Sequence, residues 1–598
     1  MASHLHRHAV AAALLAGALV LAGTAATARH AATADEPDFG PNVKIFEPGM
    51  STTAIKTRID KIAARQIPNQ FGTDRYALLF MPGTYGSAAA PLNFQVGYYT
   101  EVAGLGSTPN DVTVNGTIDV YNQCFPDGCT ALVNFWRSVS NLTIDVAGKE
   151  NSCQFGEFWA TSQAAPMRRV HVNGFATLMD YCSQPSYASG GFIADSQFTG
   201  STVVNGSQQQ YLVRNSSLDG WTNAVWNQVF AGVQNAPAQS FPNPPYTTLA
   251  TNPVSRERPF LYVDSNEHFN VYVPDAQLNG SGTTWAGGQT PGHSIPIEDF
   301  FIAKPTDGVR AINDALTQGK NLLFTPGVYN VDRTIRVNRS DTIVLGLGMA
   351  TLTAQNGVVP MTVADVKGVE VAGLIFDAGP TTSPALLQFG DQTPAGPSDA
   401  SDPGALQDVF FRIGGPHVGK ATASLVVNRD NTILDDIWAW RADHGSGVGW
   451  TTNTADTGVV VNGDNVVATG LFAEHYQKYN VFWAGENGKT IMFQNELPYD
   501  PPNQAAYQHD GVLGWAAYKV ADSVTTHEGW GLGSYCFFNV DPTIHASHAF
   551  EVPVTPGVKL HDILDLSITN HGTIDHVVND FGPPTDADTH PSYVVEYP

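Results

Sequence analysis

Two ten-residue stretches of this sequence are nearly the same. "ALLFMPGTYG" spans 77–86 and "NLLFTPGVYN" spans 321–330. Before each stretch, apolar residues recur at helical spacing, in "STTAIKTRIDKIAARQ" and in "DGVRAINDALTQGK". The duplicated unit is therefore larger than ten residues. It comprises a helix, a turn, an apolar strand, a Pro-Gly turn and a tyrosine.

Short β-rich segments separated by turn signals follow each copy. Examples are "DVTVNGTIDVY" after the first and "GVVVNGDNVVATGLFAEHY" after the second, with such turns recurring roughly every 20 to 30 residues. This spacing predicts the coils of a parallel β-helix. In the alternative, an antiparallel sandwich, Asn-Gly would close hairpins, but the period is too long for hairpins. The helix before each array is well placed to cover its open end.

Two segments rich in Pro, Gly, Ser and Thr separate the arrays. They are "APAQSFPNPPYTTLATNPVSRERPF" and "PDAQLNGSGTTWAGGQTPGHSIP", and they mark the crossing from one array to the next. We therefore expect an N-terminal β-helix domain over 40–290, which includes this crossing arm, and a C-terminal β-helix domain over 291–598.

The first residues have the pattern of a targeting segment. A weakly basic start precedes an apolar run over 9–23, and small residues follow. Residues 1–34 are therefore interpreted as a secretory signal peptide, cut after Ala28 or Ala34. A membrane anchor is disfavoured because the apolar run is short and no second span follows. We expect a secreted, extracellular protein without a membrane partner.

Composition argues against several classes of function. The 30 basic and 55 acidic residues give a formal charge of −25, which repels phosphate backbones and disfavours nucleic acid as a partner. Among the five cysteines, proximity suggests the pairs Cys124 with Cys129 and Cys153 with Cys182, which leaves Cys536 free. The sequence has no CxxC pair or His-Cys cluster with zinc spacing, so we expect no metal and no cofactor.

The densest group of chemically active residues lies in "LFAEHYQKYNVFWAGENGKTIMFQNELPYD". Glu474 and Glu496 are 22 residues apart, about one coil of a β-helix, which would place them on adjacent rungs facing one groove. Glycoside cleavage needs an acid for the leaving oxygen and a polar site for the attacking water. Beside Phe493, Leu497 and Tyr499, partial desolvation would raise the pKa of Glu496 toward that of a general acid. From spacing alone, a solvated loop residue is the stronger interpretation of either glutamate.

Further candidates are aromatic and polar residues that could contact a sugar. In "IWAWRADHGSGVGW", a tryptophan could stack on glucose and Asp443 could bind hydroxyls. Trp438 and Trp440 are interpreted as alternating, so that one can face the coil interior and the other the outside. The candidate binding residues are Gln209, Gln210, Trp226, Trp440, Asp443, His444, Trp450, Tyr479, Trp483 and Tyr499. An ordinary exposed or core residue is the alternative for each.

Several longer motifs occur in order along nearly the whole chain. They are the two Pro-Gly-x-Tyr entries, "WATSQAAPMRRV" at 159–170, "SGGF" at 189–192, "NGSQQQYLVRN" at 205–215, "RERPFLYVD" at 256–264, "NELPYD" at 495–500 and "EGWGLGSYCFFN" at 528–539. By these motifs the sequence resembles bacterial members of glycoside hydrolase family 55, the exo-β-1,3-glucanases or laminarinases. The resemblance implies an all-β fold of two tandem right-handed parallel β-helix domains of the pectin-lyase type. They would lie side by side, each entered by a short capping helix.

The resemblance also implies an activity. Family members take glucose from the non-reducing end of β-1,3-glucan with inversion at the anomeric carbon. The glutamate of the "ELPYD" motif, here Glu496, would be the general acid, while Gln163 and Ser189 would place the attacking water. Glu474 would be the second acidic group, either as the base or within a proton relay. We expect a β-1,3-glucan as partner, a monomer, and a metal-independent reaction.

Two other functions are compatible with a secreted β-helix. A polysaccharide lyase of the pectate-lyase type would need a calcium site and a base beside a uronate. Asp435 and Asp436 are adjacent, so a strand would direct them to opposite faces, and the net negative charge disfavours a polyanionic substrate. The other alternative is a non-catalytic polysaccharide-binding or adhesion β-helix. Loss of reducing-sugar release in Glu496→Gln with glucan binding retained would separate enzyme from binder.

Overall fold

The computed structural model describes residues 37–148, 153–223, 225–392, 398–585 and 591–598. The predicted signal peptide, residues 1–34, lies outside the described residues. The architecture below belongs to the compact unit Phe39–Pro598. In the described part of the chain, no helix is both long enough and apolar enough to span a membrane.

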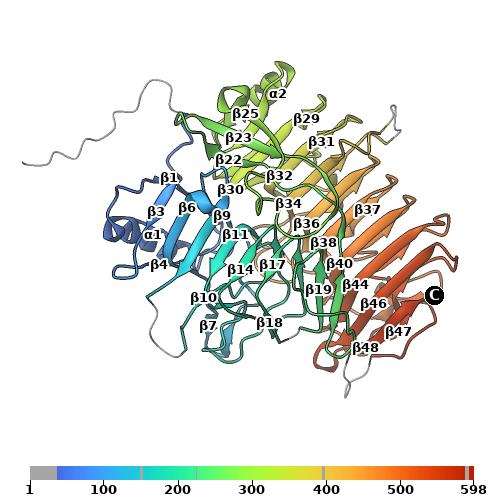
Figure 1. Ribbon diagram of the computed structural model, residues 1–598. Helices are drawn as coiled ribbons and strands as arrows, with labels where there is room; N and C mark the ends of the chain where they lie inside the picture. The colour runs from blue at the N-terminus through green and yellow to red at the C-terminus, as the bar shows by residue number, and fades with distance from the viewer. Residues whose placement is uncertain (1–36, 149–152, 224, 393–397, 586–590) are drawn as a thin grey trace, which may run out of the picture. The chain divides into compact units, whose positions relative to one another are not determined.

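The first part of this unit is an array of parallel strands, drawn from blue to green in Figure 1. Near its start lies α1 (Thr52–Gln66), which the Ser51 side chain caps by accepting from the Ala54 amide. The buried isoleucines of α1 follow the predicted helical spacing. The main sheet runs through β1 (Val43–Phe46), β2 (Tyr76–Phe80), β5 (Thr100–Gly104), β9 (Arg137–Val146), β11 (Met167–Asn173), β13 (Phe192–Ala194), β16 (Gln210–Arg214), β19 (Asn227–Ala231) and β20 (Tyr246–Leu249).

The second part begins with β26 and α2 (Val309–Thr317), and its strands run from yellow to red in Figure 1. Its longer sheet contains β26 (Phe300–Ala303), β27 (Asn321–Phe324), β30 (Ile343–Ala354), β32 (Glu370–Asp377), β34 (Gly404–Ile413), β36 (Thr432–Arg441), β38 (Val467–Glu474), β40 (Gly488–Glu496), β44 (His527–Cys536), β46 (Val558–Ser567) and β48 (Ser592–Tyr597). The facing sheet contains β29 (Ile335–Val337), β31 (Met361–Val363), β33 (Ser383–Phe389), β35 (Ala421–Val427), β37 (Ala455–Val461), β39 (Val481–Trp483), β43 (Tyr518–Val520), β45 (His545–Glu551) and β47 (Thr573–Val578).

Nearly all neighbouring strands in these sheets pair in parallel, and strands from the two sheets of the second array alternate along the chain. This is the coil pattern of a β-helix, so the prediction of an all-β protein with parallel sheets is confirmed. Between the arrays lies a small antiparallel sheet of β22 (Phe260–Val263), β23 (Phe269–Pro274) and β25 (Gly292–Pro296). The right hand of the coils and the boundary near residue 290 stay predictions.

One residue per coil in the longer sheet has a left-handed backbone at the same register position. These residues are Gly373, Asp408, Asp436, Gly470, Met492, Gly531 and Asp562. Before and after this residue, side chains point alternately into the core and out of the coil. The left-handed residue interrupts this order, so the alternation starts again after it. In β38, Leu471 and Ala473 belong to the core, while Phe472 packs outside it. The last residue, Glu474, therefore also points outward.

The same geometry corrects the prediction for the paired tryptophans. Trp438 and Trp440 both point out of the coil, with ring centroids 5.4 Å apart. The prediction that they face opposite ways is wrong, because residues two apart on a strand share a face. In the register, Trp440 is followed by Glu474 and then Glu496 on successive strands, so the three side chains form one outward column.

The outward faces of the two arrays meet in an aromatic and an ionic contact. Trp438 packs against Trp136 of the first array at 5.5 Å between centroids. Asp435 accepts from Arg168 at 2.7 Å and from Arg214 at 2.6 Å. Burial alone would raise the pKa of Asp435, but these guanidinium groups lower it to about 2. Asp435 is thus engaged by arginines across the junction, which leaves it a poor calcium ligand for a lyase.

Candidate active site

A cavity of about 740 Å³ lies between the two arrays, within the size range of small-molecule sites. The first array contributes Leu132, Tyr187, Gln209 and Trp226 to its lining, and the second contributes Glu496, Tyr499 and Phe537. Tyr187 is 57% exposed and Trp226 is 38% exposed, whereas Glu496 is only 7% exposed. The cavity therefore combines an aromatic rim with a carboxyl largely withdrawn from water.

Glu496 is the last residue of β40 and receives two hydrogen bonds. Gln209 Nε2 donates to Oε1 at 2.8 Å, and the Tyr499 hydroxyl donates to Oε2. Burial, followed by the charge of Glu496, raises the pKa of Tyr499 well above its usual value, so this hydroxyl remains a donor. The predicted desolvation of Glu496 is confirmed by its burial, and Tyr499 lies beside it as the sequence suggested. Gln209, predicted only as a sugar-binding residue, instead bonds to Glu496 itself.

Glu474 lies beside Glu496 on the neighbouring strand, where strands are about 4.8 Å apart. The adjacent rungs predicted from the 22-residue spacing are confirmed. Gln163 Nε2 donates to Glu474 Oε1 at 2.6 Å, and Trp438 Nε1 donates to Oε2 at 2.8 Å. Burial, followed by the charge of Glu496, raises the pKa of Glu474 well above its usual value. Both oxygens of this basic carboxyl are occupied by donors from the protein.

A chain of side-chain hydrogen bonds joins the surroundings of the two carboxyls. The Ser189 hydroxyl donates to Gln163 Oε1, and Gln163 Nε2 lies 3.3 Å from Gln494 Oε1. Gln494 Nε2 in turn donates to Gln209 Oε1 at 2.6 Å. The four residues predicted to be catalytic thus lie in one buried network, two from each array. Their chemical roles stay predictions.

Asp443 and His444 follow the end of β36 and bond to each other. His444 Nδ1 lies 2.9 Å from Asp443 Oδ1, and His444 Nε2 lies 2.6 Å from the side-chain nitrogen of Gln70 in the first array. Burial raises the pKa of Asp443, but the hydrogen bond with His444 and the nearby His475 lower it to about 2. Asp443 is therefore a carboxylate at ordinary pH. Neither Asp443 nor His444 belongs to the lining of the cavity, so their role in sugar binding stays a prediction.

Comparisons with known proteins identify the family of this chain. A family model for the LAM55 pectate lyase-like domain matches residues 300–496. An exo-β-1,3-glucanase of Streptomyces sp. (strain SirexAA-E / ActE) is 53% identical over 562 residues, which cover 94% of this chain and 90% of that protein. This chain belongs to glycoside hydrolase family 55. The resemblance seen in the sequence motifs is confirmed.

Solved structures agree with this family 55 assignment. The structure of sacteLam55A from Streptomyces sp. SirexAA-E superposes with a TM-score of 0.89 at 52% identity, covering 94% of this chain and 99% of that one. A variant of sacteLam55A solved in complex with glucose gives a TM-score of 0.89 at 51% identity with the same coverage. The structural match to sacteLam55A thus covers nearly the full length of this chain, and the pectate lyase-like domain model matches residues 300–496 within it.

Two disulfides lie in the loops of the first array of this family 55 chain. Cys124 pairs with Cys129 and closes the turn between β7 (Gln123–Phe125) and β8 (Gly128–Thr130). Cys153 pairs with Cys182, and Cys536 is free and buried. Both pairings predicted from proximity are confirmed. All four bonded cysteines belong to the array that supplies the aromatic rim.

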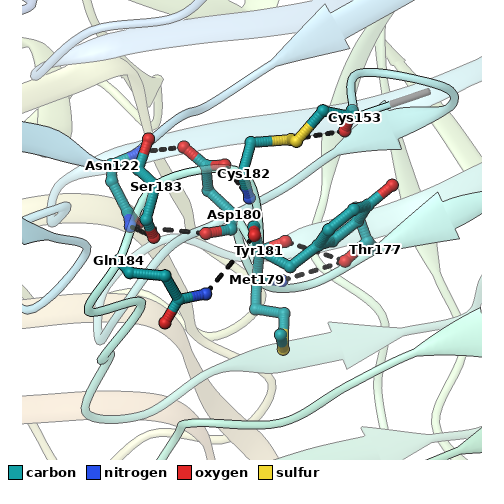
Figure 2. The surroundings of a disulfide bond; sticks show 9 residues. All are labelled: Asn122, Cys153, Thr177, Met179, Asp180, Tyr181, Cys182, Ser183 and Gln184. Atoms are coloured by element: carbon teal, nitrogen blue, oxygen red, sulfur yellow. Dashed lines mark hydrogen bonds between the residues drawn. A yellow bond between two sulfur atoms is a disulfide. The ribbon is translucent and has the colours of Figure 1, made fainter. Parts of the chain in front are cut away.

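Figure 2 shows how the second disulfide is integrated into its loop. The Asp180 carboxylate accepts from the backbone amides of Asn122 at 3.1 Å and of Cys182 at 3.0 Å. The Asn122 side chain also donates to the Ser183 carbonyl at 3.3 Å. The loop then continues to Tyr187, whose carbonyl accepts from the Ala131 amide at 2.8 Å. These bonds and the disulfide hold the segment that leads into the cavity wall.

Two predicted sugar-binding residues are buried in other roles. Trp483 is fully buried in the core of the second array, where it stacks on Tyr518 at 6.2 Å, so its prediction as a binding residue is wrong. It lies on the facing sheet with its side chain inside the coil. Gln210 is also fully buried and donates to the carbonyls of Phe493 at 2.8 Å and Gly531 at 3.0 Å. It joins the two arrays and cannot reach a ligand.

Three further candidates lie in separate aromatic groups. Tyr479 packs edge-on against Trp515 at 4.9 Å, and Trp450 packs edge-on against Tyr507 at 6.3 Å. Neither belongs to the lining of the cavity. Trp440 is only 1% exposed, with Trp438 against it. The structure therefore places none of these three rings in the lining of the cavity.

Two site residues, Gln494 and Tyr535, were missed by the sequence argument, and Trp438 was considered only as a ring that could stack on glucose. Gln494 links the two networks, Trp438 binds Glu474, and Tyr535 stacks under Trp226 at 5.4 Å. Gln494 was detectable, because it stands two positions before the acid of the "NELPYD" motif and so shares its face. Tyr535 follows Glu496 by one coil in the register. That relation could not be read from the sequence because a long loop intervenes.

Proposed function

We propose that this chain is a secreted exo-β-1,3-glucanase that releases glucose from the non-reducing end of laminarin-type glucans. We further propose that it acts as a monomer. The observation that carries the proposal is the pair Glu474 and Glu496, which are adjacent in the register of a family 55 chain, with Glu496 in the lining of the cavity. The neutral amides and exposed aromatic rings around the acid suit an uncharged sugar.

In the proposed mechanism, Glu496 is the general acid. It lines the cavity, so its proton can pass to the glycosidic oxygen as the bond to the anomeric carbon breaks. Gln209 and Tyr499 hold its two oxygens and therefore fix the direction of the carboxyl. The carboxylate left after proton transfer is stabilised by the same two donors.

The attacking water is held between Ser189 and Gln163 and gives up one proton to Glu474. Protein donors occupy both oxygens of Glu474, and the residue is 3% exposed, which disfavours attack by the carboxylate itself on the anomeric carbon. Its raised pKa suits a group that takes up a proton during the reaction. Direct attack by water inverts the anomeric configuration.

Replacement of Glu496 by Gln tests this function. The amide retains the size of the side chain but has no proton to give, so kcat on laminari-oligosaccharides should fall by about a thousandfold while glucan binding is retained. Glu528→Gln is the matched control, because Glu528 is a partly exposed strand residue paired with Lys489 at 2.6 Å. Unchanged glucose release by the Glu496 variant would contradict the proposal.

A further inference from the structure

His475 directly follows Glu474, and no step of the proposed mechanism uses it. It is 3% exposed and has a left-handed backbone with φ 67°, a conformation that is costly for most residues with a Cβ. Its amide donates to the Glu496 carbonyl at 2.8 Å, and its carbonyl accepts from Arg441 at 3.1 Å. The backbone of His475 is thus fixed on both sides in an unusual conformation beside the acid.

The ring of His475 is also fixed in direction. Nδ1 lies 3.1 Å from the Leu497 carbonyl, which can only accept, so Nδ1 carries a hydrogen and Nε2 has the lone pair in the neutral ring. Nε2 lies 3.9 Å from Glu496 Oε2 and 3.9 Å from Asp443 Oδ1. The ring packs edge-on against Tyr499 with centroids 4.4 Å apart. These contacts hold Nε2 between two carboxyl groups.

This placement directs His475 Nε2 toward two carboxyl groups, one of which changes its charge during the proposed reaction. While Glu496 is protonated, Asp443 is the carboxylate facing Nε2. Once Glu496 has given its proton to the leaving sugar, two carboxylates face Nε2, each with an oxygen 3.9 Å away. The charged and titratable groups around the ring are Asp443, Glu474, Glu496, Tyr499, Arg441 and, through Asp443, His444.

We propose that His475 returns a proton to Glu496 after each turnover. The inference rests on the proposed function. After the bond to the leaving sugar has broken, Glu496 is a carboxylate. His475 Nε2 takes a proton from a solvent hydronium ion and passes it to Glu496 Oε2, which restores the neutral ring. The proton that the attacking water gives to Glu474 passes to solvent, so one water is consumed and no net proton is gained or lost.

Asp443 and His444, which lie beside His475, are partly exposed to solvent. The Asp443 side chain is 25% exposed and that of His444 is 35% exposed, whereas those of His475 and Glu496 are nearly buried. Asp443, whose pKa is lowered to about 2, stays a carboxylate beside His475 Nε2. His475 acts through Glu496 and is therefore a positioning residue for the proton, separate from the groups that touch sugar.

The test compares two substrates in His475→Asn. Asparagine tolerates the left-handed backbone and can retain a donor near the Leu497 carbonyl, but it has no nitrogen at the ε position. Laminaritriose needs a protonated acid for its leaving sugar, whereas β-glucosyl fluoride has a leaving group that departs without a proton. We expect kcat on laminaritriose to fall at least about tenfold while kcat on the fluoride stays near that of the wild type.

A matched control is His509→Asn, because His509 Nδ1 also lies 2.9 Å from a carbonyl, that of Gly514, outside the cavity lining. Its kcat should be unchanged on both substrates. Equal losses on both substrates in the His475 variant would indicate a purely structural role and overturn the proposal. No loss on either would overturn it as well.

The same pair of substrates separates this inference from the proposed function. If Glu496→Gln loses laminaritriose cleavage but keeps activity on β-glucosyl fluoride, Glu496 is the acid. The His475 variant then tests only the proposed return of the proton. If Glu496→Gln cleaves laminaritriose as the wild type does, the proposed function fails, whatever the His475 variant does.

Discussion

The two arrays are built alike but contribute differently to the cavity. In the second array, β36 has 10 residues and β40 has 9, and a continuous facing sheet accompanies them. In the first array, the second face is reduced to two-residue strands such as β12 (Ala176–Thr177) and β15 (Val203–Val204). The regular array supplies both carboxyls from strand ends, and the irregular one supplies the rim and the proposed water site from loops.

This difference explains how a duplicated fold can form a single site. Parallel register fixes the separation of Glu474 and Glu496 without further support. Loops have no such register, and the first array holds them with two disulfides and the hydrogen bonds around Asp180. The two arrays are then joined by contacts such as those of Arg214 with Asp435 and of Gln209 with Glu496, and the following experiments test these contacts and the loops of the first array.

Replacement of Arg214 should have the largest effect, because it breaks the junction between the arrays. Arg214 is fully buried and bonds to Asp435 at 2.6 Å, so Arg214→Leu leaves a buried carboxylate with fewer partners. We expect the free energy of unfolding to fall by about 3–5 kcal/mol. Urea unfolding followed by fluorescence measures this fall.

The exposed ion pair of Lys56 and Asp60, at 2.9 Å on helix α1, supplies the control. Lys56→Ala should lower the free energy of unfolding by less than about 1 kcal/mol, because water screens this pair. Equal effects of the Arg214 and Lys56 variants would contradict the view that buried ion pairs hold the arrays together.

Glu474→Gln should lower activity but increase stability relative to the wild type at high pH. Without the proton acceptor, kcat should fall by about a hundredfold. The pKa of Glu474 is raised in the folded state above its unfolded value of about 4.3, so the wild type loses stability as pH rises from that value through the folded pKa. The glutamine variant lacks this loss. The free energy of unfolding of both proteins is measured in urea at pH 4 and pH 8. Relative to the wild type, the variant should be more stable at pH 8 than at pH 4. The same stability difference between the two proteins at both pH values would argue against the raised pKa.

Trp226→Ala tests the rim of the first array. The loss of one stacking face costs about 1 kcal/mol, which corresponds to about a fivefold rise in KM on laminarihexaose with kcat unchanged. Phe581 is similarly exposed, at 54%, but does not line the cavity, so Phe581→Ala should leave both constants unchanged. A fall in kcat without a rise in KM would assign Trp226 to the chemistry and not to the rim.

Removal of the Cys153–Cys182 disulfide should have the smallest effect. In the double serine variant, the loop leading to Tyr187 loses its covalent anchor but keeps the Asn122 and Asp180 hydrogen bonds. We expect a rise in KM smaller than that of Trp226→Ala, measured on laminarihexaose. Cys536→Ala, which removes the free thiol, is the control and should leave KM unchanged. A loss of kcat as large as that of Glu474→Gln would show that the disulfide is essential to the water site.

The features of the fold and site that repeat with the coil period could be predicted from the sequence. The 22-residue spacing was enough to place Glu474 beside Glu496, because each coil returns the chain to the same face. Contacts between arrays have no such period: Gln163 and Glu474 are 311 residues apart, and only the family motif pointed to Gln163. Period counting also could not tell which sheet a strand joins, and for that reason Trp483 was misplaced.

The stereochemistry of glucose release tests the central claim most directly. If the second array provides the carboxyls and the first provides a water held by Ser189 and Gln163, water attacks the anomeric carbon in a single displacement. Proton NMR during the first minutes of laminarihexaose hydrolysis should then show α-glucose appearing before mutarotation. Initial release of β-glucose would mean a covalent intermediate on a carboxylate and would contradict a site assembled from both arrays in this way.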